Sequence, residues 1–274
     1  MPDLRPAALS QALGLFDHDD DGNLFLGGNF GALKTSLAVN SKNSNSDINN
    51  HWAAHVSLRA AAHDIWNIAA IVERLEWMRN LAIQQELPES WRTYAKLDVS
   101  HIIYEFRSIF DHVACAAGSL SARPGTIPES FERLIKNREK HQAILGAMYD
   151  SLNRDFTWFY DLRVMRTAIV HRGSEPLVFC SPKDGLLFQV HGRNHENLIF
   201  VPEFMYNSNV VRFEPYAAYY FAEMLSFLED FATAAMGQIE FPLPMTGVRN
   251  YCLGYQHLVR WMENLLERLI EAEI

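Results

Sequence analysis

The amino-acid sequence predicts a mainly α-helical protein, an up-and-down helical bundle with a small antiparallel β insert. Long stretches without helix breakers have apolar residues at helical spacing, and 49% of all residues are hydrophobic. Short β-prone runs are confined to residues 176–213. We expect an N-terminal arm and polar linker over residues 1–48 and the bundle, with its insert, over residues 49–274.

The N-terminal arm is expected to begin with a short helix at residues 7–16, followed by an acidic turn from Asp17. Aspartates at positions 1, 3 and 5 of this turn and glycine at position 6 match a calcium-binding loop. Position 12, however, is Gly28, where such a loop needs a bidentate glutamate. We therefore interpret the segment as an acidic turn in which side chains bond the backbone. Residues 40–50 are rich in Asn and Ser and predict a linker or long loop.

Apolar periodicity predicts the helices of the main body, and turn residues separate them. The expected helices cover residues 51–85, 90–119, 129–138, 139–172, 216–238 and 251–274. Between the fourth and fifth, residues 177–180, 186–190 and 198–201 are β-prone, and the turn at 182–185 joins the first two as a hairpin.

Composition narrows the classes of function. The formal net charge is −9 and the pI is near 5.6, whereas a protein that holds long nucleic acid on its general surface is usually basic. RNA or a nucleotide would therefore bind in a local cationic cleft. The three cysteines form no CxxC pair, and no convincing metal cage or cofactor motif is present. With no signal peptide and no apolar run long enough to span a membrane, we expect a cytoplasmic protein without cofactors.

Residues 161–173 contain the densest group of cationic and proton-carrying side chains. Arg163 and Arg166 lie three apart on a helix that Gly173 should end, which places His171 and Arg172 in its last turn. The negative end of the helix dipole favours positive charge there. An arginine-rich helix end can also be only a solvated surface with a favourable dipole interaction.

Arg166, four intervening residues and His171, followed by Arg-Gly, resembles the signature of the HEPN family of helical proteins, many of which are metal-independent ribonucleases. Residues 104–112 are similar to the preceding helix of such bundles, and the resemblance covers roughly residues 50–240. Active members usually have Asn, Asp or His after the motif arginine. Here that position is Thr167, which favours the alternative of a non-catalytic protein that binds a nucleotide or a partner protein.

The resemblance implies a mechanism and a set of partners. His171 would take a proton from a ribose 2'-hydroxyl, and Arg166, with Arg163 or Arg172, would stabilise charge on the phosphoryl oxygens. Active members are homodimers, and a toxin-like member would have an antitoxin or regulatory protein as a partner. Asp111 either orients the active-site His or Arg, or forms an i, i+4 ion pair with Arg107 on its own helix.

Overall fold

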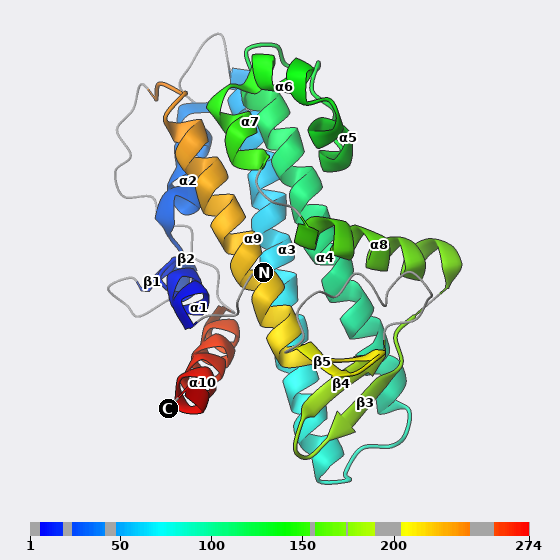
Figure 1. Cartoon of the computed structure of the whole chain (residues 1–274). Helices are drawn as coiled ribbons and strands as arrows, with labels where there is room; N and C mark the ends of the chain where they lie inside the picture. The colour runs from blue at the N-terminus through cyan, green and yellow to red at the C-terminus, as the bar shows by residue number, and fades with distance from the viewer. Residues whose placement is uncertain are drawn as a thin grey trace.

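Two long antiparallel helices, α3 (Ile48–Ile83) and α4 (Trp91–Leu120), form the centre of the molecule. In the computed structural model α9 (Phe213–Met236) runs beside them, and the three build a helical bundle (Figure 1). The structure describes residues 6–18, 24–41, 48–153, 157–173, 175–189, 204–241 and 255–273. It confirms a mainly α fold with a small antiparallel sheet.

The continuous helix predicted over residues 139–172 is wrong, because the chain forms separate helices there. These are α6 (Arg138–Leu145), α7 (Ala147–Leu152) and α8 (Thr157–Arg172), preceded by α5 (Phe131–Lys136). Gly146 ends α6 with a φ of +56°, in the left-handed region that favours glycine. A Cβ atom there would lie 2.8 Å from the Gln238 side-chain amide, so a larger residue at this position would require the Gln238 side chain to move.

Aromatic side chains join these helices to the bundle. The ring centroid of Phe110 on α4 lies 4.9 Å from Phe159 on α8, 4.9 Å from Phe227 on α9 and 5.0 Å from Phe131 on α5. All four rings are fully buried. Burial of each phenylalanine side chain stabilises the fold by about 1.5–3 kcal/mol, so this cluster is a main link between the four helices.

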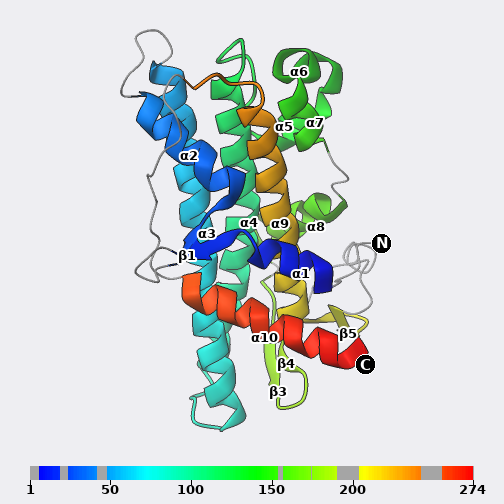
Figure 2. The same ribbon diagram turned by 90° about the vertical axis from the view of Figure 1, so that its left-hand side faces the viewer.

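Three further helices cover one side of the bundle. α2 (Gly28–Ser41) packs against α3 and α9, while α1 (Pro6–Leu13) and α10 (Tyr255–Glu273) lie across the long helices (Figure 2). The helix α2 was not expected from the sequence, since polar residues interrupt its apolar pattern. Two of these are buried in the fold: the Asn40 amide donates to the Ser36 carbonyl at 2.9 Å, and Ser41 donates to the Ala38 carbonyl.

The acidic turn lies between two short strands of the N-terminal segment. β1 (Phe16–His18) pairs with β2 (Leu24–Leu26) as an antiparallel hairpin, with Phe16 opposite Leu26. Residues 19–23, which include most of the aspartates of the turn, lie outside the described residues.

The insert forms a four-stranded antiparallel sheet in the order β3-β4-β6-β5. Its strands are β3 (Val178–Ser181), β4 (Gly185–Gln189), β5 (Met205–Asn207) and β6 (Val210–Arg212). The predicted hairpin at 177–190 is confirmed, with Val178 opposite Phe188. The strand predicted at 198–201 lies outside the described residues, and β5 and β6 were not expected.

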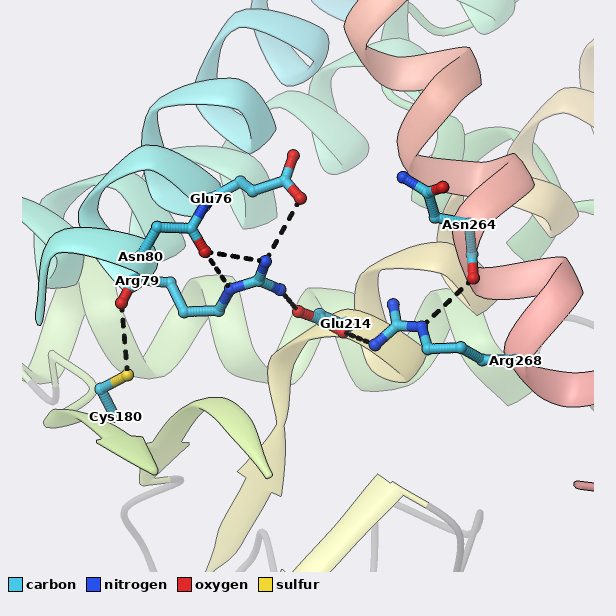
Figure 3. A network of polar contacts seen from close by, with 7 residues as sticks. All are labelled: Glu76, Arg79, Asn80, Cys180, Glu214, Asn264 and Arg268. Atoms are coloured by element: carbon cyan, nitrogen blue, oxygen red, sulfur yellow. Dashed lines mark hydrogen bonds and ion pairs between the residues drawn. The ribbon is translucent and has the colours of Figure 1, made fainter. Parts of the chain in front are cut away.

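A polar network links the sheet, α3, α9 and α10 (Figure 3). Glu214, near the start of α9, is almost fully buried and pairs with Arg79 of α3 through one oxygen and with Arg268 of α10 through the other. Cys180 of β3 donates to the Arg79 carbonyl at 3.8 Å. Arg79 also pairs with Glu76 at 3.3 Å, so two carboxylates balance two guanidinium groups, and we assign this network to the attachment of α10 rather than to ligand binding.

Candidate functional site

α8 presents the residues of the predicted site on a projecting helix. The helix runs across α4 and extends beyond the edge of the bundle (Figure 1). Its large buried apolar residues recur at steps of three or four and are Phe159, Leu162, Met165 and Ile169. The side chains of Arg166, His171 and Arg172 point away from this apolar face and are exposed.

The end of α8 matches the prediction from the sequence. His171 and Arg172 lie in the last turn, and Gly173 follows with a φ of +61°. A glycine in this left-handed conformation commonly ends a helix, because no Cβ atom opposes it. The unpaired carbonyl groups of the last turn favour cations, so the local field supports the charge of Arg172.

Arg166 is available to bind an anion. Within the described ranges its guanidinium forms no ion pair, and the side chain is exposed. Its charge reaches Tyr104 on α4: burial and then the Glu175 carboxylate raise the pKa of Tyr104, and Arg166 opposes that rise. Glu175 itself forms an ion pair with Lys96.

Arg163, one turn before Arg166, is engaged on the surface. Its Nε atom lies 2.7 Å from Oε2 of Glu132, whose other carboxylate oxygen pairs with Lys136. The Lys136 hydrogen bond and the Arg163 charge lower the pKa of Glu132, against an opposing effect of burial. Exposed pairs of this kind contribute about 0–1 kcal/mol, so Arg163 could exchange Glu132 for a phosphate at little cost.

Arg107 and Asp111 make their contacts at the start of α5 rather than with Arg166 or His171. Nη1 of Arg107 lies 2.7 Å from Oδ1 of Asp111, which is the i, i+4 ion pair that the sequence allowed. The same oxygen accepts a hydrogen bond of 2.8 Å from the Phe131 N–H, an otherwise unpaired donor of the first turn of α5. The Arg107 guanidinium also lies 5.1 Å from the Phe159 ring centroid. These contacts place both residues at the junction of α4, α5 and α8.

The side chains of Arg166 and His171 on one chain do not converge on one point. Residues five apart on a helix differ in direction by about 140°, so one α8 does not direct Arg166 and His171 at the same phosphate. Thr167, which follows the motif arginine, is half-buried between them. A single helix offers an anion contact and a separate proton-transfer group, and joint action requires a second surface.

A buried polar cluster between α3 and α4 was missed in the sequence. Oε1 of Glu105 accepts from Asn67 at 3.1 Å and lies 2.8 Å from the His101 ring, while Asp64 lies 3.3 Å from the ring of His112. Burial, followed by repulsion from Asp64, raises the pKa of Glu105 to about 7. The i, i+4 spacing of His101 and Glu105 was a signal, but only the pairing of the helices brings Asp64 beside them.

Asp161, at the inner side of α8, is a second carboxyl group with a raised pKa. Burial raises the pKa of Asp161 to about 7, and a hydrogen bond from the Tyr220 hydroxyl only partly offsets this effect. The residue is 5% exposed, whereas Arg163, two positions later, reaches solvent. Asp161 therefore belongs to the attachment of α8 to α9 and not to the cationic surface.

Replacement of Asp161 with asparagine should make the protein more stable at pH 8 but not at pH 4. An aspartate in the unfolded chain has a pKa of about 3.9, so between pH 4 and 7 the folded state keeps a proton that the unfolded state has lost. The wild-type free energy of unfolding should consequently fall through this window, while asparagine needs no proton and can still accept from Tyr220. Urea unfolding of both proteins from pH 4 to 8 measures the difference, and a difference that stays constant with pH would contradict the assignment.

The described residues contain neither a cluster of metal-ligating side chains nor a membrane-spanning helix. No group of three or more His, Cys, Asp or Glu side chains among them could hold a metal ion. None of the helices in those ranges is both long and apolar enough to cross a membrane. Cys115 and Cys180 are free thiols.

Comparison of the chain with models of protein families, with curated proteins and with solved structures finds no match.

Proposed function

We propose that the protein is a metal-independent endoribonuclease of the HEPN type. The observation that supports the proposal is the joint exposure of Arg166 and His171 on α8, with neither side chain paired to a carboxylate in the ranges that the structure describes. Burial of His171 would indicate that this residue has a structural role. A buried carboxylate partner for Arg166 would indicate that its guanidinium is not available to a substrate. Both side chains instead face solvent.

The proposed reaction uses the substrate's own nucleophile. His171 accepts the proton of a ribose 2'-hydroxyl, and the 2'-oxygen then forms a bond to the adjacent phosphorus. The bond from phosphorus to the 5'-oxygen breaks, and this oxygen takes up a proton, which leaves a 2',3'-cyclic phosphate and a 5'-hydroxyl end. Arg166 stabilises the charge on the phosphoryl oxygens by forked hydrogen bonds, with Arg163 or Arg172 beside it.

A homodimer would bring these groups together. Because Arg166 and His171 of one chain diverge by about 140°, two α8 helices related by a two-fold axis would supply Arg from one chain and His from the other. The projection of α8 from the edge of the bundle leaves this helix accessible to a second copy (Figure 1).

A non-catalytic protein that binds a nucleotide or a partner protein is the alternative. Thr167 favours it, since active HEPN members usually have Asn, Asp or His next to the motif arginine, and here a half-buried threonine occupies that position. The net charge of −9 favours it as well. In this role Arg166 and Arg172 would bind phosphate groups, and His171 would have no part in proton transfer.

Cleavage of matched oligonucleotides in excess EDTA tests the proposal. We expect cleavage of the RNA strand and none of the all-deoxy strand, because only the former has a 2'-hydroxyl. The new 5' ends should accept phosphate from a polynucleotide kinase without prior phosphatase treatment. Cleavage of the deoxy strand, or complete loss of activity in EDTA, would refute the mechanism. Phosphate or nucleotide binding without cleavage of any RNA would support the alternative.

A further inference from the structure

The outer face of α3 has a row of residues at regular helical spacing, all exposed except the half-buried Ala70. Its positions follow one another at alternating steps of four and three, and they are Trp52, Val56, Arg59, His63, Trp66, Ala70, Glu73 and Trp77. The three tryptophans are 46%, 38% and 57% exposed. The row extends over about 37 Å at 1.5 Å per residue. Single exposed apolar residues are ordinary, but three tryptophans in one row of eight indicate an interaction surface.

The spacing of this row is that of the contact positions in a coiled coil. Its steps read the same in both directions, so two copies of α3 can pair antiparallel about a two-fold axis between His63 and Trp66. In that arrangement His63 faces Trp66 of the second copy, and Trp52 faces Trp77. The His63 and Trp66 rings already stack within one chain at 5.7 Å, with an angle of 11° between their planes, which gives the centre of the row a flat aromatic surface.

The charges on the row are complementary under the same symmetry. Arg59 faces the small Ala70 of the second copy, and Glu73 lies one turn further along that copy, within reach of the Arg59 guanidinium. Arg59 forms no ion pair among the described residues, and Glu73 has only an exposed contact of 3.1 Å to His257. The two-fold axis repeats the Arg59–Glu73 pair, so each copy contributes one cation and one anion.

We propose that the outer face of α3 is an interface with a second copy of this chain, paired antiparallel through the row from Trp52 to Trp77. This contact goes beyond the proposed function and uses a different helix from α8. A chain that has both contacts forms a larger symmetric assembly. Loss of the α3 contact turns a dimer into monomers, or a closed tetramer into dimers, and so halves the mass.

Charge-reversal variants of Arg59 and Glu73 test the proposal. The mass of each variant is measured by light scattering or sedimentation at micromolar concentration. Arg59→Glu places two glutamates together at both symmetry-related contacts, and we expect the dissociation constant to rise at least about tenfold, which is about 1.4 kcal/mol. Glu73→Arg should act in the same way. The double variant Arg59→Glu/Glu73→Arg should restore the mass of the wild type. Arg92→Glu, a charge reversal at another exposed arginine, at the start of α4, is the matched control and should not change the mass.

Trp66→Glu gives a second test, since a carboxylate at the centre of the row should halve the mass. Circular dichroism checks that the variants keep the wild-type helix content and melting temperature. A wild type that is monomeric at all micromolar concentrations would overturn the proposal, as would a mass unchanged by Arg59→Glu and Trp66→Glu. Failure of the double variant to recover would overturn the antiparallel register. None of these outcomes depends on RNA cleavage, so the proposed function is tested separately.

Discussion

Replacement of His171 with alanine should lower RNA cleavage by roughly 10² to 10⁴, the range that proton transfer by a positioned side chain typically contributes. The fold should remain intact, because His171 is exposed in the last turn of α8. The loss should appear in kcat, since the proton moves in the transition state. Initial rates on one RNA oligonucleotide in EDTA give the comparison.

Variants at Arg166 separate charge from geometry in the same assay. Arg166→Ala should cause a loss of similar size, because transition-state charge on the phosphoryl oxygens is no longer stabilised. Arg166→Lys should recover little, since an ammonium group cannot form the forked contact of a guanidinium. Full activity in Arg166→Lys would show that only charge is needed.

His257→Ala is the matched control for residue type and exposure. His257 is exposed on α10, which lies on the opposite side of the bundle from α8 (Figure 1). Its ring lies 3.1 Å from the carboxylate of Glu73. Cleavage should be unchanged in this variant. Equal losses in His171→Ala and His257→Ala would indicate a contaminating nuclease or a general effect on folding, and not a site on α8.

Phe110→Ala should reduce the free energy of unfolding by about 3–5 kcal/mol, the usual cost of truncating a buried phenylalanine. The Phe110 ring contacts three other buried rings, and its removal leaves a cavity where α4, α5, α8 and α9 meet. Natural domains are stable by only about 5–15 kcal/mol, so this change should be readily measured by urea unfolding.

Tyr94→Ala is the control for this measurement. Tyr94 is an aromatic residue of the same helix, but 61% of it is exposed, and a surface substitution of this kind usually changes stability by less than about 0.5 kcal/mol. Phe110→Leu, which fills part of the cavity, should lose less than Phe110→Ala and guards against a variant that does not fold. Equal effects at positions 94 and 110 would contradict the assignment of Phe110 to the core.

The sequence by itself determined the fold class and the ends of the longest helices. Residues 51–85 and 90–119 were predicted as helices, and α3 and α4 begin and end within three residues of those bounds. Apolar periodicity is a property of neighbouring positions, so it can be read without knowledge of what covers the apolar face. The end of α8 at Gly173 was predictable for the same reason, because a helix stop depends on the conformational freedom of one residue.

Only the tertiary structure decided where the helix predicted over residues 139–172 is interrupted and which polar side chains form hydrogen bonds within the fold. Gly146 could sit inside a helix at modest cost, and it ends α6 in a fold where the Gln238 amide, 92 positions later, occupies the space beside it. The sequence around Asp111 does not distinguish a residue that orients a catalytic group from one that caps a helix, and only the fold brings its carboxylate to the Phe131 N–H at the start of α5. In the sequence Asp161 lies within the cationic stretch, yet in the fold it faces inward to Tyr220. Successive residues of a helix differ in direction by about 100°, so neighbours in the sequence can lie on opposite faces of α8.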